Sequence, residues 1–296
     1  MKHLVHWDDI EPRRREEGHL AGDWYDLGDA AGSVEVGLKR IRIDPGKWST
    51  PAHAEGAEEE IFFVLSGSGL SWQDGEAYEV GEGDVLVHLP EEQAHTLRAG
   101  PDGLDVLAYG QRKPHGNTVL PRAGVAWMWP GWVDVGGPHP WEREAAVGEP
   151  EVGEISPRPE RIANVTEGLR YELETGAVDL NLGDVVGSRE TGLSHMTIPP
   201  GAEAYPPHCH AAEEELFVVL GGSGTVTLGD GSADVRPGSV VSRPAGTRVA
   251  HSFQAGDTGL AYLAYGTRVP NDVVYYPRTD EIRFRGVGVT MPASDR

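Results

Sequence analysis

One pattern of histidine and glutamate occurs twice in this chain, and it constrains the fold more than any other feature. The first copy reads PAHAEGAEEEIFFVLSGSG (51–69) and the second reads PPHCHAAEEELFVVLGGSG (206–224). Each copy has a histidine seven residues before the third glutamate of an EEE run, and a further histidine follows. These residues are His53, Glu60 and His95 in the first copy, and His208, Glu215 and His251 in the second. Imidazole and carboxylate groups are ligands of divalent transition metals, so the pattern predicts a duplicated metal site.

The internal repeat is longer than the two histidine blocks. LGDAAGSVEVGL (27–38) matches LGDVVGSRETGL (182–193) at an offset of 155 residues. GLDVLAYGQRKP (103–114) matches GLAYLAYGTRVP (259–270) at an offset of 156. One residue has therefore entered between the two halves of the pattern, which a surface turn tolerates. Self-similarity over this length predicts two domains of the same architecture.

Short apolar runs in each repeat predict β-strands. IFFVL and LFVVL, DVLVHLP and SVVSRP, and LDVLAYG and LAYLAYG are apolar and bounded by glycine or proline. The chain holds 40 Gly and 22 Pro, which is typical of a sandwich or barrel with many tight turns. The predicted fold class is therefore all-β. REEGHLAG (15–22) is predicted as a short helix or loop, and the C-terminal tail as an edge strand.

The repeats divide the chain into three predicted parts. Residues 1–120 are assigned to an N-terminal barrel, 121–161 to a linker rich in Trp, Pro and Gly, and 162–296 to a C-terminal barrel. A free linker would not carry so many apolar rings. We expect the segment to pack across a barrel or against a second subunit, with an aromatic platform for substrate as the alternative. The rings in question are Trp127, Trp129, Trp132 and Trp141.

Composition excludes several partners. The net charge of −22 and the pI of 4.8 predict no binding to nucleic acid, because phosphates would be repelled. No apolar run reaches the roughly 18 residues of a membrane helix, so no membrane partner is expected. The N-terminal stretch lacks the apolar core of an export signal, and the one cysteine, Cys209, is typical of a reducing compartment. We expect a cytoplasmic protein with a small-molecule substrate or ligand; a homodimer is compatible with the sequence but unsupported by it.

The second copy offers four metal donors. His208 and His210 are two apart in an extended stretch, so both side chains lie on one face and Cys209 on the other. Glu215 has the parity of the apolar residues that face the barrel interior, and His251 completes the set. The predicted site contains three imidazole nitrogens and one carboxylate oxygen.

The EEE runs leave the identity of the carboxylate open. Glu214 could replace Glu215, and Glu59 could replace Glu60. We favour the third glutamate of each run because it lies seven residues before a glycine in both copies. The other glutamates are predicted as solvated turn carboxylates; these are Glu58, Glu59, Glu213 and Glu214.

The pattern resembles that of the cupin superfamily. One family motif is matched by Gly201, His208, His210, Glu215 and Gly222, with one extra residue after the first glycine. The other is matched by Gly238, Pro244, Gly246 and His251, with two extra residues before the histidine. The resemblance covers residues 24–115 and 179–275, as in a bicupin. It implies two double-stranded β-helix (jelly-roll) barrels, each with a metal ion at its centre.

The first repeat departs from the family pattern. Glu55 stands where the second histidine is expected, and Glu92 replaces a glycine. The candidate donors are then two histidines and two carboxylates, namely His53, Glu55, Glu60 and His95. Such a set prefers a different metal, and we expect this site to bind an ion differently, weakly or not at all. The predicted cofactor is a divalent transition metal ion, Mn or Fe in preference to Zn, Ni or Co.

Two classes of function follow from the resemblance. The first is a metal-dependent enzyme that acts on a small oxygenated metabolite by dioxygenase-like or oxalate-decarboxylase-like chemistry, chiefly at the second site. The second is a non-catalytic binding or storage protein whose metals brace the barrels. A decarboxylase also needs an acid and a cation near the ion, for which Arg243, Arg248 and Tyr265 are candidates only by their place in the sequence.

Overall fold

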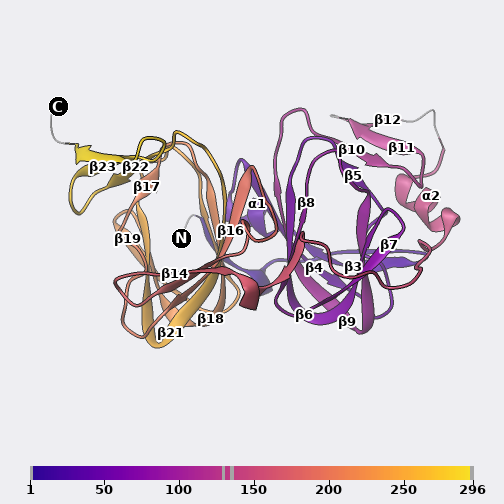
Figure 1. The fold of residues 1–296 in the computed structure, drawn as a ribbon, viewed down its shortest axis with the longest axis horizontal. Coiled ribbons are helices and arrows are strands. Elements are labelled where there is room, and N and C mark those ends of the chain that lie inside the picture. Colours follow the sequence, from indigo (N-terminus) through magenta and orange to yellow (C-terminus); the bar gives the residue numbers. More distant parts are fainter. Residues whose placement is uncertain (1–2, 129–130, 134–136, 294–296) are drawn as a thin grey trace.

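The computed structural model describes residues 3–128, 131–133 and 137–293. These residues form two barrels that lie side by side, one from each repeat (Figure 1). Each barrel combines an eight-stranded sheet with a four-stranded sheet, and helices are short. The predicted all-β fold with two tandem jelly-roll barrels is confirmed.

The first barrel is built largely from the first repeat. Its eight-stranded sheet comprises β2 (Arg13–Glu17), β3 (Leu20–Tyr25), β4 (Val36–Ile43), β6 (Glu60–Gln73), β7 (Glu76–Gly81), β8 (Asp84–His88), β9 (His95–Gln111) and β13 (Ile162–Asn164). Its four-stranded sheet comprises β5 (Ala54–Glu55), β10 (Asn117–Leu120), β11 (Val125–Met128) and β12 (Gly131–Val133).

The second barrel repeats this arrangement. Its eight-stranded sheet comprises β1 (Leu4–His6), β14 (Leu169–Glu172), β15 (Val178–Asn181), β16 (Thr191–Ile198), β18 (Glu215–Leu228), β19 (Gly231–Val235), β20 (Ser239–Arg243) and β21 (His251–Thr267). Its four-stranded sheet comprises β17 (Cys209–His210), β22 (Val273–Tyr276), β23 (Glu281–Phe284) and β24 (Val289–Pro292). The predicted C-terminal edge strand is β24.

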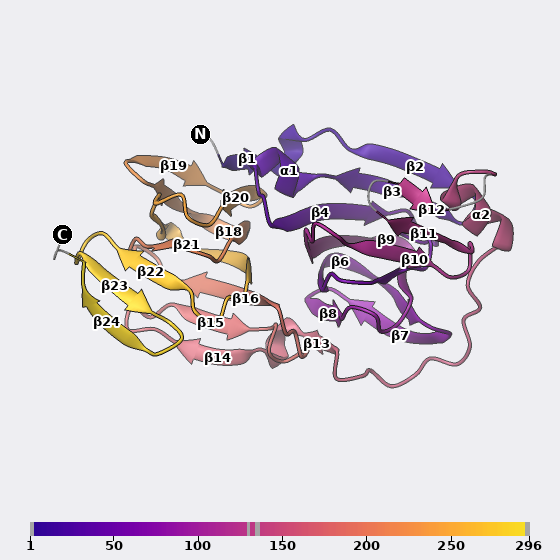
Figure 2. The same cartoon turned by 90° about the horizontal axis from the view of Figure 1, so that it is seen from above.

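Each large sheet includes one strand from the opposite part of the chain. β1, within the segment predicted for the first barrel, pairs with β20 of the second. β13, within the segment predicted for the second barrel, pairs with β8 of the first. Figure 2 shows both crossings, with the N-terminus against the second barrel. The two barrels therefore share strands as well as a linker.

Two α-helices and two 3-10 turns complete the described chain. They are α1 (Leu27–Ala31), α2 (Pro140–Val147), η1 (Trp7–Asp9) and η2 (Val165–Glu167). No described helix is long and apolar enough to cross a membrane.

The prediction for residues 15–22 is wrong, because they belong to the β2–β3 hairpin, whose turn contains Gly18 with φ 56°. β2 is an exposed edge strand. Its charged sequence therefore lacks the apolar alternation that marks a half-buried strand.

Part of the tryptophan-rich linker packs on the first barrel, as predicted. Trp141 of α2 meets Trp24 edge to face, with 5.5 Å between ring centroids, and Arg15 lies over the Trp141 ring. Trp129 and the side chain of Trp132 lie outside the described residues.

The largest apolar cluster lies between the barrels. It takes buried residues from both repeats, for example Leu38 and Phe63 from the first and Leu193 and Leu216 from the second. Tyr109 and its repeat equivalent Tyr265 meet there, with ring centroids 4.7 Å apart. Because an extensive apolar interface restrains domain motion, the two barrels behave as one unit.

Two buried glutamates, one from each repeat, bind the opposite repeat across this interface. Glu59, fully buried, accepts hydrogen bonds from Ser188 Oγ at 2.6 Å and from the backbone amides of Arg189 at 2.7 Å and Thr191 at 3.1 Å. Glu214, also fully buried, accepts from the backbone amides of residues 34–36. Each carboxylate therefore binds the loop before the first long strand of the other repeat.

The prediction that these glutamates are solvated is wrong. Glu213 is buried as well, while Glu58 is partly exposed and accepts from the Lys113 amide at 3.1 Å. A turn carboxylate is solvated unless another segment supplies donors, and for Glu59 and Glu214 the opposite repeat supplies them. A pattern within one repeat cannot show that contact.

Replacing Glu59 by alanine should destabilise the whole chain. The substitution leaves several donors of residues 188–191 without an acceptor, and each unsatisfied buried donor costs about 1–3 kcal/mol. We expect the free energy of unfolding in urea to fall by about 3 kcal/mol. The control is Glu172→Ala on the exposed edge strand β14, which should change it by less than about 0.5 kcal/mol. Equal effects of the two substitutions would contradict the interface role.

Candidate metal centre

The second barrel brings its four predicted donors to one place from three segments. Glu215 begins β18 and His251 begins β21, while His210 ends the two-residue strand β17. His208 is aligned with His251 by reciprocal backbone hydrogen bonds of 3.1 and 2.8 Å. The strand pairing thus places side chains that are far apart in sequence on one wall of the barrel.

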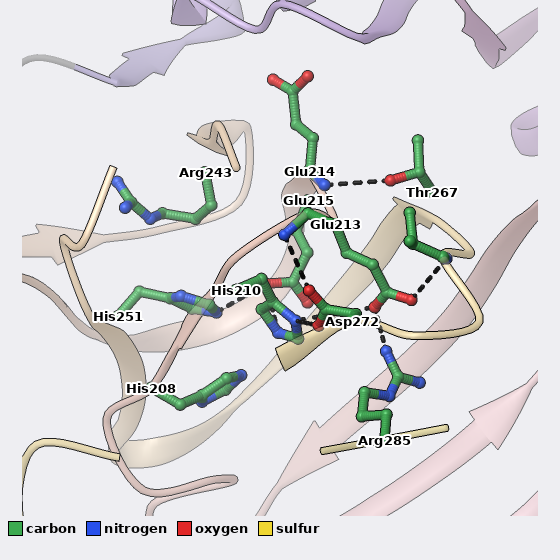
Figure 3. A network of polar contacts seen from close by, with 12 residues as sticks. His208, His210, Glu213, Glu214, Glu215, Arg243, His251, Thr267, Asp272 and Arg285 are labelled. Atoms are coloured by element: carbon green, nitrogen blue, oxygen red, sulfur yellow. Dashed lines mark hydrogen bonds and ion pairs between the residues drawn. The ribbon is translucent and has the colours of Figure 1, made fainter. Parts of the chain in front are cut away.

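The donor atoms face one another. His251 Nε2 lies 3.1 Å and His210 Nε2 3.5 Å from Glu215 Oε2. One donor atom each of His208, Glu215 and His251 lies within 4.8 Å of the other two. Figure 3 shows the three imidazoles around the Glu215 carboxylate, while the Glu214 side chain extends away toward the other barrel.

A carboxylate outside the motif orients His210. Asp272, fully buried, contacts His210 Nδ1 through Oδ2 at 2.6 Å and accepts from the Ala212 amide through Oδ1 at 2.9 Å. This contact directs the other ring nitrogen, Nε2, toward Glu215. Sequence reasoning missed Asp272, which lies 62 residues after His210. The corresponding position of the first repeat is Gly116, so the repeat offers no signal for it.

His210, Glu213 and Asp272 form a further group of neighbouring histidine and acidic side chains. Glu213 lies 3.7 Å from His210 Nδ1, but its carboxylate accepts from the Val269 amide at 2.9 Å and pairs with Arg285. Because protein donors already occupy the oxygens of Glu213 and Asp272, these residues hold the His210 ring in place.

The protonation states of Glu215 and His208 fit a metal ion. Burial would raise the pKa of Glu215, but the neighbouring imidazoles, His251 foremost, hold it well below its usual range. Burial lowers the pKa of His208 to about 4, so its ring is neutral at neutral pH. His210 Nε2 and Glu215 Oε2 are buried without a hydrogen-bond partner among the described residues. Buried polar atoms normally have partners, and a shared ion would provide one.

The first barrel brings its four predicted donors together too. Glu60 Oε2 lies 3.1 Å from His95 Nε2 and 3.7 Å from His53 Nε2. His53 Nε2 is 4.0 Å from Glu55 Oε1, and Thr118 donates to the other Glu55 oxygen at 2.7 Å. Burial would lower the pKa of His53, but Glu60 and Glu55 raise it above its usual range. The surplus of carboxylates here stabilises a positive charge.

The two centres differ in how they meet the cavities of the described chain. A cavity of about 450 Å³ includes all four of its donors. In the first barrel the cavity beside Glu55 does not reach the other three donors. The side chains at one pair of equivalent positions explain the difference. Trp24 pairs with Ile41 in the first barrel, and Asp179 pairs with Met196 at the same place in the second. The indole is buried in the core of the first barrel, whereas the smaller carboxyl leaves space in the second.

The other residues that the sequence offered as catalytic candidates are less suited to that role. Arg243 is buried and donates to Thr247 Oγ1 at 3.1 Å and to the Val249 carbonyl, which braces the loop before His251. Arg248 is exposed, and Tyr265 packs against Tyr109 in the core between the barrels. Cys209 is buried, and burial raises the pKa of its thiol, which does not favour a nucleophile.

Weakening the contact to Asp272 should loosen metal binding in the second barrel. In Asp272→Asn the ring of His210 loses its anionic partner, and loss of such a contact typically lowers metal affinity by about 10–100-fold. Competition with a fluorescent chelator would measure the change, with His210→Ala expected to abolish binding at this centre. Asp257→Asn, at an exposed position, is the control. Wild-type affinity in the Asp272 variant would contradict the assigned role.

Comparisons with known proteins agree with this geometry. A family profile described as a cupin domain matches residues 39–107 and 194–264, once in each barrel. None of the curated proteins matches the sequence.

Solved structures with the same fold include two oxalate decarboxylases. The enzyme from Lactobacillus farciminis, solved as a formate complex, is 17% identical over 90% of this chain and 86% of its own, with a TM-score of 0.63. The Bacillus subtilis enzyme is 14% identical over 90% of this chain and 78% of its own, with a TM-score of 0.59. The chain therefore carries a cupin domain in each of its two barrels.

Proposed function

We propose that the chain is a metal-dependent enzyme that acts on a small, oxygenated and anionic molecule in its second barrel. One observation carries the proposal. His210 and Glu215 line a cavity of about 450 Å³, and their Nε2 and Oε2 atoms are buried without a hydrogen-bond partner among the described residues. A bound ion would keep coordination positions open on the cavity side, as catalytic rather than structural sites do.

The donor set supports a divalent transition metal. Three imidazoles and one carboxylate fit Mn or Fe, and also Zn, Ni or Co. Such an ion would supply Lewis-acid chemistry, and with Mn or Fe also redox chemistry. A further structure of the Bacillus subtilis oxalate decarboxylase, 15% identical to this chain, is described as having Mn(II) centres, which favours Mn as the first metal to test.

An arginine at the cavity wall supports an anionic substrate. Arg283 lies in register with Val274, which lies in register with His210. Directly paired residues of antiparallel strands project to the same face, so Arg283 is on the metal side of the small sheet and lines the cavity. Arg285 is already paired with Glu213, whereas Arg283 has no ion pair with a described residue. A guanidinium in that position recognises a carboxylate well.

Two reaction classes remain open at this centre. The guanidinium of Arg283 favours a small carboxylate as the substrate, as in decarboxylase-like chemistry. The aromatic walls from Phe217, Phe253 and Tyr262 also fit a ring, as in dioxygenase-like chemistry. The first centre differs, because its interior is filled by Trp24 and its donors include Glu55. These observations favour a bracing role for a metal in the first barrel.

Metal content and turnover together test the proposed function. Elemental analysis of untagged protein should find a transition metal at the second centre. The loaded protein should convert at least one member of a panel of oxalate, malonate and catechol, and His210→Ala should convert none. A wild-type chain that holds metal in its second barrel without any turnover would support the non-catalytic binding protein instead.

Replacing Arg283 by glutamine should weaken the binding of a dicarboxylate selectively. A hydrogen bond to a charged group contributes about 1.5–3 kcal/mol, so we expect the Kd of oxalate, measured by calorimetry on the loaded protein, to rise by about 10–100-fold. Metal content should not change. Arg278→Gln serves as the control, since that arginine pairs with Glu203 and does not line the cavity. Equal oxalate binding by both variants would contradict an anion site at Arg283.

A further inference from the structure

Asp179 has an unusual environment for an acidic side chain. It lies on β15 in register with Met196 of β16, which lies in register with Tyr262 of β21. All three residues line the cavity that holds the second metal centre. Asp179 is thus directed toward the barrel interior, yet it is outside the group of clustered metal donors.

The carboxyl of Asp179 is only partly satisfied. Its Oδ1 is buried without a hydrogen-bond partner among the described residues. Its Oδ2 accepts from the Tyr205 hydroxyl at the long distance of 3.4 Å. Buried polar atoms are rarely left unpaired, and an unpaired one marks a strained or functional site.

The groups that face Asp179 do not neutralise it. Burial raises the pKa of Asp179, and the hydroxyls of Ser194 and Tyr205 oppose that effect only in part. Burial and the Asp179 charge raise the pKa of Tyr205 to about 12, and Tyr262 is shifted in the same direction. Both phenols therefore stay protonated at neutral pH, and no arginine or lysine pairs with Asp179 among the described residues.

Tyr205 connects this carboxyl to the metal centre. The Tyr205 ring packs edge to face against His208, with 6.2 Å between ring centroids. Asp179 and the donors of the centre thus line one cavity, with Tyr205 in contact with both sides. The first barrel has Trp24 at the equivalent position, and its cavity does not reach its histidines.

We propose that Asp179 is the catalytic acid of the second cavity and that Tyr205 positions it. The inference rests on the proposed function. In the proton-transfer step, the carboxyl O–H bond breaks as a bond forms between that proton and a basic atom of the bound molecule. The electron pair of the O–H bond stays on the carboxylate, which regains a proton from water. The fold thus keeps a partly buried acid with an unsatisfied oxygen at this position because the reaction uses its proton.

Asp179→Asn tests the proposal, because it keeps the shape and removes the proton. With the panel member that turns over fastest, we expect kcat to fall by about 100-fold or more, with KM within about twofold and metal content unchanged. Asp234→Asn, at an exposed position of β19, is the matched control and should behave as wild type. Wild-type kcat in Asp179→Asn, or loss of its metal, would overturn the proposal.

A thermal readout gives a decision that does not require activity. The pKa of Asp179 is higher in the folded state than in the unfolded state, so ionisation of this carboxyl favours unfolding. The loss of stability begins as the pH rises through the unfolded-state pKa and is complete above the folded-state pKa. Asp179→Asn should therefore melt at a higher temperature than wild type at neutral pH, with the gain vanishing below the usual aspartate pKa.

The thermal result also separates two kinds of failure. If the loaded wild type converts no member of the panel, the proposed function fails, and the thermal result alone decides whether the fold raises the pKa of Asp179. A variant that melts no higher than wild type at neutral pH would overturn the inference about Asp179 in either case.

Discussion

The reciprocal burial of Glu59 and Glu214 is the contact on which the rest of the structure depends. Each carboxylate accepts hydrogen bonds from the opposite repeat, and each directly precedes a metal-centre glutamate, Glu60 or Glu215. In a strand, neighbouring side chains point to opposite faces. One residue of each EEE run therefore joins the barrels while the next faces a candidate metal centre. The geometry of each centre is consequently supported by the other half of the chain.

The same fold carries two centres of different character. Glu55 takes the place of His210, and Trp24 takes the place of Asp179. The first change adds negative charge to the first centre, and the second fills the interior beside it with an indole. A small number of side-chain differences on one backbone arrangement is therefore enough to separate an enclosed centre from an open one. This is how duplicated folds acquire distinct sites without changing their topology.

Much of the fold could be predicted from the sequence, because the repeat and the apolar runs are local signals. The convergence of His208, His210, Glu215 and His251 could be anticipated from motif spacing, and the structure brings these side chains together. Other features depend on contacts between distant segments. Asp272 and Arg283 come from strands after the motif, and Asp179 comes from a strand before it. Nothing in their local sequence distinguishes them from surface residues, so only the strand register reveals their place.

Strand exchange between the barrels bears on how such a chain could arise. β1 completes the sheet of the second barrel and β13 completes that of the first. Two separate copies of a single-barrel ancestor could make the same contacts by swapping arms as a symmetric pair. Fusion of the two genes would then join subunits that already depended on each other. Neither fragment obtained by cutting the linker would possess a complete sheet, so the halves would have to be brought together to recover the native assembly.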